Sequence, residues 1–359
     1  MSAYLPMSFP ESVRLSSIPG FLDRLFDASR EALSSGKLFS VRADLCDQPF
    51  LFASSSKDRI ELIRSRVNIS TAKVKGTPES LLSLSADELG WQVPRWAETD
   101  WLKPQYDECL ARAGYEAEYP YFDRDWTMRC KSDSFGIHIV PSWNSLRPWD
   151  QGAPLRVLFN FAFRQNGCLL LHAGSIGRDG HAALLSGVGG SGKSGTVLAG
   201  LAHGLESVGD DYILLDPRDG YRVRRIFRII KQAPGGLSRI PGLAGRVGER
   251  PLNWQGKVEF DPSEVFPAAM VNDQKVAAIL FPRIEKASKC LLAPVERRQA
   301  ATRLVRGMEN EFAGETVARL LAMTRLTAKV PAHELRLSPD PAEAASIIDE
   351  LLRRTRMAS

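Results

Sequence analysis

A glycine-rich loop between two different hydrophobic patterns constrains the fold of this 359-residue chain more than any other feature. Residues 187–194 read Gly-Val-Gly-Gly-Ser-Gly-Lys-Ser, which fits the pattern G-x-x-x-x-G-K-[ST]. The apolar run before it (182–186) predicts a strand, and the run after it (194–205) predicts a helix. Because glycine has no Cβ, the backbone can come close to a ligand and surround phosphate groups with its N–H donors.

A lysine and a serine at the end of this loop indicate which ligand it takes. We expect Lys193 to bridge the β- and γ-phosphates of ATP, and the Ser194 hydroxyl to bind Mg²⁺. The helix that starts near Lys193 adds its N-terminal amides and its dipole. A glycine-rich connection without a ligand would not explain the Lys193-Ser194 pair. The predicted nucleotide-binding residues are Gly187, Val188, Gly189, Gly190, Ser191, Gly192, Lys193, Ser194 and Gly195.

Two adjacent aspartates, Asp210 and Asp211, precede the next apolar run, Tyr-Ile-Leu-Leu. Phosphoryl transfer to a hydroxyl needs one carboxylate that positions or deprotonates the acceptor and another that holds the metal. Neighbouring side chains of an extended chain point to opposite sides, so two adjacent acids can divide these tasks. We assign the metal to Asp211 and keep Asp216, at the end of the run, as the second candidate. The alternative interpretation is that Asp210 and Asp211 have no catalytic role and only form a turn before a strand.

Composition excludes several other classes of protein. The net charge of +5, from 47 basic and 42 acidic residues, is too small to indicate nucleic acid as a partner. No apolar run approaches the roughly 18 residues of a membrane helix, and the first residues lack the pattern of a secretory signal. The five cysteines form no C-x-x-C pair, which predicts a reduced, cytoplasmic setting.

A turn-rich stretch at 142–154 predicts the division of the chain into two parts. Residues 1–150 are expected to form a smaller mixed α/β region, which is our candidate for substrate recognition. Residues 151–359 are expected to form the domain that carries the loop. Within it, 168–176 and 181–186 predict a hairpin that runs into the loop. An antiparallel pair beside the loop predicts a mixed sheet.

A basic segment, residues 221–250, carries eight arginines and lysines and a single acid, Glu249. Two interpretations stay open. The segment is a solvated face with a loop, or it is a lid that reaches over phosphates or an acidic substrate. No interleaved aromatic residues accompany these charges, and this disfavours nucleic-acid binding.

The run 168–216 resembles the catalytic domain of HPr kinase/phosphorylase, and it is more similar still to the HPr-kinase-related lasso peptide (serine) kinases. In that superfamily a His-Gly or His-Ala pair precedes a hairpin, a P-loop and an Asp-Asp motif, and all four occur here in this order. The resemblance implies the fold of the phosphoenolpyruvate carboxykinases, α/β (α+β) with the P-loop on a mixed sheet. It also implies a phosphotransferase that uses ATP and Mg²⁺, with a hydroxyl acceptor on a peptide, a protein or a small molecule.

The resemblance also assigns roles to single residues. It implies catalytic functions for Asp210 as general base and for His172 and Lys193 near the transferred phosphoryl group, with Asp211 near the metal. It matches Lys231 and Lys257 to lysines found downstream in the related kinases, and Arg283 to an arginine at a strand end. These last three are expected to contact phosphate or substrate. The resemblance is also compatible with a homo-oligomer.

The chain departs from HPr kinase at two places. Gly195 stands where HPr kinase has an acid after the P-loop serine, and 221–260 lacks the glycine-rich signature with a metal-binding glutamate. Recognition of the protein HPr and the reverse phosphorylase reaction are therefore not carried over. The alternative function is a nucleotide-binding regulatory or assembly ATPase that transfers no phosphate to an acceptor. A carboxykinase is disfavoured by chain length.

Overall fold

The computed structural model describes residues 12–72, 75–96, 103–118, 124–285, 289–307 and 316–357. The chain forms two compact units, Met1–Gln165 and Asn166–Ser359. Each unit has its own mixed sheet with helices packed on it, so the expected α/β fold with mixed sheets is confirmed. Among the described residues, no helix combines the length and the apolar composition needed to cross a membrane.

The N-terminal unit is built on a six-stranded sheet in the order β2-β3-β4-β8-β7-β6. The pairs β3–β4 and β4–β8 are parallel and the others antiparallel. A separate parallel pair joins β1 (Ser12–Val13) to β5 (Arg95–Trp96). The six strands are β2 (Phe39–Leu45), β3 (Gln48–Ser54), β4 (Glu79–Ser85), β6 (Tyr115–Ala117), β7 (Trp126–Cys130) and β8 (Phe135–Val140).

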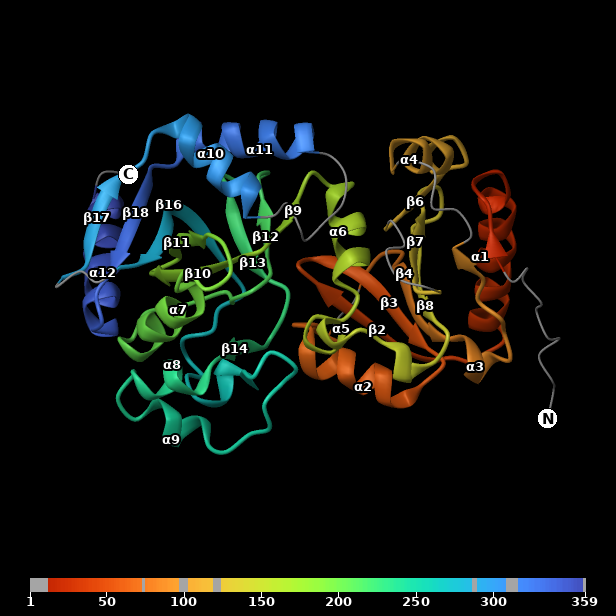
Figure 1. Ribbon diagram of the computed structural model, residues 1–359, viewed down its shortest axis with the longest axis horizontal. Helices are drawn as coiled ribbons and strands as arrows, with labels where there is room; N and C mark the ends of the chain where they lie inside the picture. Colours follow the sequence, from red (N-terminus) through yellow and green to blue (C-terminus); the bar gives the residue numbers. More distant parts are fainter. Residues whose placement is uncertain are drawn as a thin grey trace. The chain divides into compact units, whose positions relative to one another are not determined.

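Helices cover both faces of this sheet (Figure 1). On one face α1 packs Phe21 against Trp126 of β7, with ring centroids 5.2 Å apart. On the other face α6 packs Phe159 against Phe52 of β3, with centroids 6.0 Å apart. The helices of the unit are α1 (Ile18–Ser34), α2 (Lys57–Arg66), α3 (Ala86–Leu89), α4 (Lys103–Arg112), α5 (Pro148–Gly152) and α6 (Arg156–Arg164), with 3₁₀ turns η1 (Leu15–Ser17) and η2 (Trp143–Ser145).

This packing places the division of the chain after Gln165, later than the boundary predicted at residue 150. The sequence pattern indicates the helix at 156–164 but not the sheet on which it packs. The phenylalanines of α6 complete the apolar face of β3 and therefore hold the helix in the N-terminal unit.

The C-terminal unit is built on an eight-stranded sheet whose main path is β10-β11-β16-β13-β12-β9. The long strand β16 pairs in parallel with β11 and β18 and antiparallel with β13, and β17 adds to β18. The strands are β9 (Leu169–Leu171), β10 (Ala173–Arg178), β11 (His181–Ser186), β12 (Ile213–Asp216), β13 (Arg222–Arg225), β16 (Asp273–Ile284), β17 (Leu291–Pro294) and β18 (Ala332–Leu337).

The predicted hairpin is confirmed over β10 and β11, whose register pairs Ala173 with Ser186. The first predicted strand, however, is two strands. Its beginning, β9, pairs with β12, while its end, β10, pairs with β11. His172 is the single residue between β9 and β10. The break therefore places this histidine where the chain passes from one neighbour in the sheet to another.

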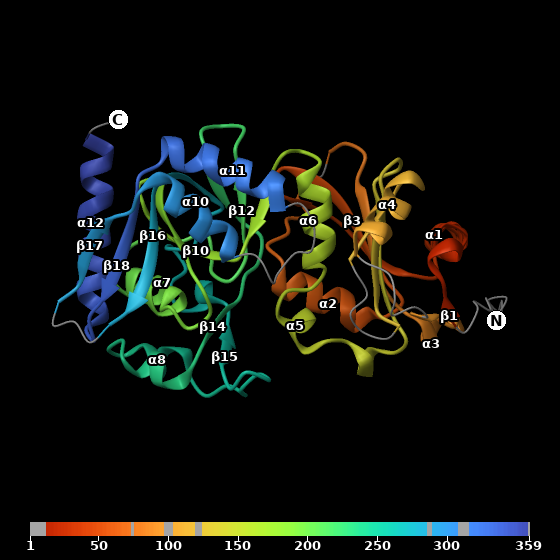
Figure 2. The same cartoon turned by 45° about the horizontal axis from the view of Figure 1, so that its top comes forward.

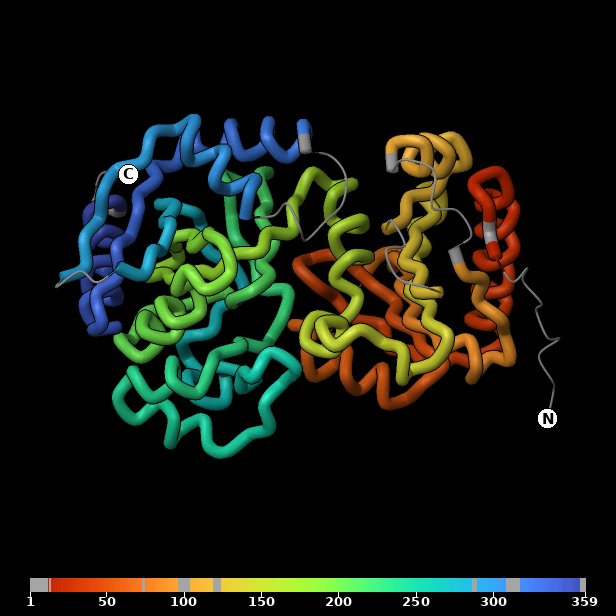
Figure 3. Tube along the Cα trace, in the orientation of Figure 1, coloured from red at the N-terminus to blue at the C-terminus, as the bar shows by residue number. Residues whose placement is uncertain are grey.

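Two helical layers and an added β-ribbon complete the unit (Figure 2). The helices α7 and α12 share one apolar cluster with β11 and β16, and α10 and α11 share another on strands of the same sheet. The ribbon β14–β15 packs with α8 and α9 into the α7 cluster, and Figure 3 traces the loop between its strands. The elements are α7 (Lys193–Ala202), α8 (Pro234–Ser238), α9 (Leu243–Val247), α10 (Arg297–Arg306), α11 (Thr316–Lys329), α12 (Pro341–Met357), β14 (Ile230–Gln232), β15 (Val258–Phe260) and the 3₁₀ turn η3 (Pro262–Glu264).

Candidate active site

The glycine-rich loop joins β11 to α7, as predicted from the sequence. Gly192 precedes α7 with φ +106°, a conformation that a residue with a side chain rarely adopts. A Cβ at this position would also lie 2.5 Å from Leu337 Cδ1. At the other end, Gly187 has φ +156°, and a Cβ there would lie 2.9 Å from Ser191 Oγ. The shape of the loop therefore requires glycine at both of its ends.

Lys193 folds back over its own loop. Its side chain is largely buried, and Nζ donates hydrogen bonds to Gly187 O at 2.6 Å and Val188 O at 3.2 Å. An ammonium held by the carbonyls of the loop lies beside the backbone that would surround a phosphate chain. The residues present therefore fit a nucleoside triphosphate.

Asp210 is buried directly behind the loop. The Ser194 hydroxyl lies beside its carboxylate and acts to lower the pKa of that group, whereas Oδ1 accepts no hydrogen bond from the residues that the structure describes. Burial and the negative charge of Asp211 raise the pKa of Asp210 above its ordinary value. A buried carboxylate beside a serine hydroxyl is typical of a Mg²⁺ site in nucleotide-binding loops, so these two residues fit the predicted metal.

A glycine that the sequence analysis did not single out makes room for this carboxylate. A Cβ at Gly174 would lie 2.8 Å from Asp210 Oδ1 and 2.8 Å from Val197 Cγ2 of α7. Gly174 therefore lets the acid and the loop helix both approach β10. The sequence contained a sign of this role. Gly174 follows the predicted His172 by two residues, and positions two apart in an extended chain lie on the same face.

Asp211 is held between a histidine and a lysine. Its Oδ1 lies 3.3 Å from His172 Nε2, and its Oδ2 accepts a hydrogen bond from Lys231 Nζ at 2.9 Å. Burial would raise the pKa of Asp211, but the hydrogen bond with His172 and the charge of Lys231 outweigh it and hold this pKa well below its usual range. The backbone of Asp211 has φ +70°, which is uncommon for a residue with a side chain. The two contacts thus stabilise a strained residue at the centre of the site.

An aromatic stack fixes the position of the histidine. The ring of His172 stacks on Tyr212 with centroids 5.5 Å apart, and Tyr212 contacts Phe227 edge-on at 6.1 Å. Tyr212 directly follows the two aspartates, but nothing in the sequence pattern showed that its ring would face His172.

The structure brings together most of the predicted catalytic residues but not all predicted substrate contacts. Lys231 joins the site through Asp211. Lys257 immediately precedes β15, and among the described residues no hydrogen bond or ion pair links its side chain to the aspartates. Arg283 is 62% exposed and pairs with Glu285 at 3.1 Å. Asp216, the second candidate for the metal, instead binds Arg218 at 2.6 Å and Arg224 at 3.2 Å.

The two aspartates contact different members of the predicted site. Ser194, the predicted metal ligand of the loop, contacts Asp210, whereas His172 contacts Asp211. The predicted assignment gave the metal to Asp211 and the acceptor to Asp210. The alternation of side chains indicated that the two acids would separate, but it did not say which of them turns toward the loop.

Most of the basic segment is engaged in ion pairs. Arg222 pairs with Asp273, Arg225 with Asp261 at 3.2 Å, and Arg228 with Asp261 at 2.8 Å. These pairs favour the interpretation as a structural, solvated face for this part of the segment. The strand β14 is different, because it brings Lys231 to Asp211. It also places Gln232 Nε2 3.4 Å from the position of a Cβ at Gly195.

No protein-family model and no curated protein matches this chain. Among solved structures, the chain has a likeness to the HPr(Ser) kinase/phosphatase from Coxiella burnetii, with 16% sequence identity and a TM-score of 0.27. The match covers 53% of this chain and 97% of that protein. A TM-score of this size does not establish a shared fold, so a function for this chain depends on its sequence motifs and on the geometry of the site.

Proposed function

We propose that this protein is an ATP- and Mg²⁺-dependent kinase that transfers the γ-phosphoryl group to a hydroxyl, with a serine of a peptide or protein as the first choice of acceptor and a small-molecule alcohol as the second. The observation that carries this proposal is the separation of the two aspartates. Asp210 contacts the loop serine, while Asp211 lies between His172 and Lys231. A protein that only binds nucleotide needs the first acid but has no use for the second.

Each residue has a task that follows from its contacts. The amides of the loop and Lys193 would hold the phosphate chain and offset its negative charge. Ser194 and Asp210 are the residues that would hold Mg²⁺, which supplies charge neutralisation at the phosphates when bound. Asp211 remains ionised at neutral pH because His172 and Lys231 stabilise its negative charge, so it can accept a hydrogen bond from the acceptor hydroxyl. Positioning and electrostatics account for most of the rate in such reactions.

One observation favours the alternative, a regulatory or assembly ATPase. Both carboxylate oxygens of Asp211 are engaged, one by His172 and one by Lys231. An acceptor hydroxyl must therefore share an oxygen with one of these groups or displace it. If neither happens, the site hydrolyses ATP slowly without phosphorylating an acceptor.

A phosphotransfer assay separates the two functions. The full-length protein is incubated with Mg²⁺ and γ-labelled ATP, first with a mixture of serine-containing peptides and then with small alcohols. We expect label on an acceptor, and we expect Lys193→Ala to abolish this transfer and to weaken nucleotide binding. Release of free phosphate alone, with every acceptor offered, would support the ATPase and contradict the kinase.

A further inference from the structure

A buried acid whose carboxylate is not directly paired with any described side chain lies in the N-terminal unit, outside the candidate active site; the charged groups that act on it from nearby are Arg59 and His138. Asp150 belongs to the five-residue helix α5 and is 9% exposed. Its carboxylate forms no hydrogen bond and no ion pair within the part of the chain that the structure describes. Burial of a carboxylate without a compensating group costs free energy, so such residues are usually paired or bind a cation.

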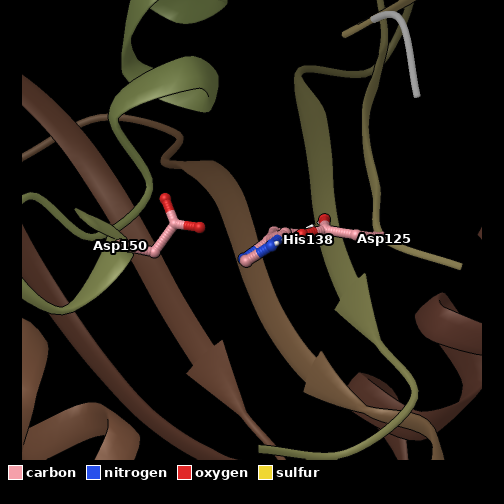
Figure 4. Close-up of side chains that lie close together, drawn as sticks. All are labelled: Asp125, His138 and Asp150. Atoms are coloured by element: carbon pink, nitrogen blue, oxygen red, sulfur yellow. Dashed lines mark hydrogen bonds and ion pairs between the residues drawn. The ribbon is translucent and has the colours of Figure 1, made fainter. Parts of the chain in front are cut away.

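Two further ligand-type side chains converge on Asp150. Asp125, just before β7, accepts a contact at Oδ1 from His138 Nε2 of β8 at 3.2 Å. One atom each from Asp125, His138 and Asp150 lies within 4.8 Å of the other two. Figure 4 shows the His138 ring between the two carboxyl groups. The three residues come from α5, the position just before β7 and the middle of β8, and all three line one pocket.

The charges around this pocket limit which cation it suits. The acids that line it are Glu118, Asp125 and Asp150, and the arginines are Arg147 and Arg156. Arg147 contacts Asp125 Oδ2 at 2.7 Å and Glu118 at 3.9 Å, which leaves Asp125 Oδ1 directed toward His138.

A third arginine lies next to the pocket. Arg59 donates to Ser83 Oγ at 2.9 Å and to the backbone carbonyl of Asp150 at 3.4 Å, so it acts on the Asp150 carboxylate through its charge and not through a hydrogen bond. With three arginines near three acids, the pocket lacks the excess negative charge on which Ca²⁺ and Mg²⁺ sites depend. A cation that bonds strongly to imidazole suits it better.

We propose that Asp125, His138 and Asp150 form a structural Zn²⁺-type site. One imidazole and two carboxylates are ligands that Zn²⁺ prefers, and Glu118 or a water would complete a tetrahedron. Tetrahedral ligands of zinc lie roughly 3.4 Å apart, so the three side chains must draw together by about 1 Å. The ion would fasten α5 and the segment before it to the strands β7 and β8. It would also give the Asp150 carboxylate a directly bound cation.

Metal analysis after equilibrium dialysis tests this proposal on the full-length protein. The protein is stripped with a chelator, dialysed against ZnCl₂ without nucleotide, and compared with Asp150→Asn and His138→Gln. We expect about one equivalent of zinc in the unaltered protein and an affinity at least about tenfold lower in both variants. Co²⁺ in place of zinc should give the visible absorption of a four-coordinate site. Zinc should raise the thermal midpoint of the unaltered protein only.

Controls make every outcome decisive. His203→Gln removes an exposed imidazole, and Lys193→Ala removes the lysine of the glycine-rich loop; both should keep full zinc binding. Asp150→Asn is the central variant, because it breaks no ion pair among the described residues and the protein should fold; circular dichroism verifies this. The proposal is overturned if the unaltered protein binds no zinc, if Asp150→Asn retains it, or if alkylation of the cysteines abolishes it.

Discussion

Lys231 Nζ lies 2.9 Å from Asp211 Oδ2, although the two residues belong to different parts of the C-terminal unit: a two-stranded ribbon and the loop before β12. Together with His172 on the other oxygen, this contact encloses an acid whose backbone is in the left-handed region. Removal of either side chain should therefore affect both the pKa of Asp211 and its position.

We expect Lys231→Ala to lower kcat by about 10- to 100-fold while ATP affinity changes little, because the hydrogen bond of Lys231 goes to Asp211 and not to the glycine-rich loop. Loss of the cation raises the pKa of Asp211, so the acid limb of the kcat–pH profile should move to higher pH. Lys231→Arg should restore part of the rate. If kcat of Lys231→Ala falls while its pH profile is unchanged, the residue acts on substrate instead.

The two aspartates should give different defects when each is changed to asparagine. Asp211→Asn should remove phosphotransfer and leave nucleotide and Mg²⁺ binding nearly intact, because the carboxylate of Asp211 is bound by His172 and Lys231 rather than by the loop. Asp210→Asn should raise the Mg²⁺ concentration required, since Asp210 contacts Ser194. Nucleotide titration at several Mg²⁺ concentrations, beside the transfer assay, measures both. The opposite pattern would restore the assignment predicted from the sequence.

Gly174→Ala should destabilise the protein and disturb the site together. The added methyl group would lie 2.8 Å from both Asp210 Oδ1 and Val197 Cγ2, and overpacking of this kind costs roughly 1–3 kcal/mol. Urea unfolding measures the change. Gly245→Ala in α9 is the matched control, because a Cβ there meets no described atom within 4 Å. Equal stability of the two variants would mean that β10 moves to accept the methyl group.

Local sequence patterns predicted the strand, the loop and the helix that carry the site, because each of these elements depends on residues that are close in the sequence. The loop needs glycines at set positions, and the apolar runs before and after it have the periods of a strand and a helix. The placement of α6 in the N-terminal unit could not be predicted in this way, because several sheets can accept the same apolar helix face.

Contacts between distant segments could not be predicted. No periodicity brings Lys231 to Asp211, since the contact depends on how β14 packs beside α7. The division of the run 168–176 into β9 and β10 also depends on partners, because β9 and β10 pair with different strands. For the same reason the sequence gives no sign that Asp125, His138 and Asp150 converge.

Asp216 should make a measurable contribution to stability that acid removes. Its carboxylate is buried, and the hydrogen bond from Arg218 lowers its pKa to about 2. An unfolded chain has an aspartate pKa of roughly 3.9, so the contribution is complete above that pH and is lost as the pH falls toward 2. With Arg218 largely exposed and screened, the contribution is about 2 kcal/mol at most.

Urea unfolding of Asp216→Asn between pH 6 and pH 3 measures this contribution. The difference in unfolding free energy between the unaltered protein and the variant should be constant near pH 6 and should shrink as the pH approaches 3. For Arg218→Ala, the difference in unfolding free energy should depend on pH in the same way but be smaller, because Arg224 still lies 3.2 Å from Asp216. A difference that does not vary with pH would mean that asparagine acts through lost packing, and that the ion pairs of Asp216 contribute nothing to stability.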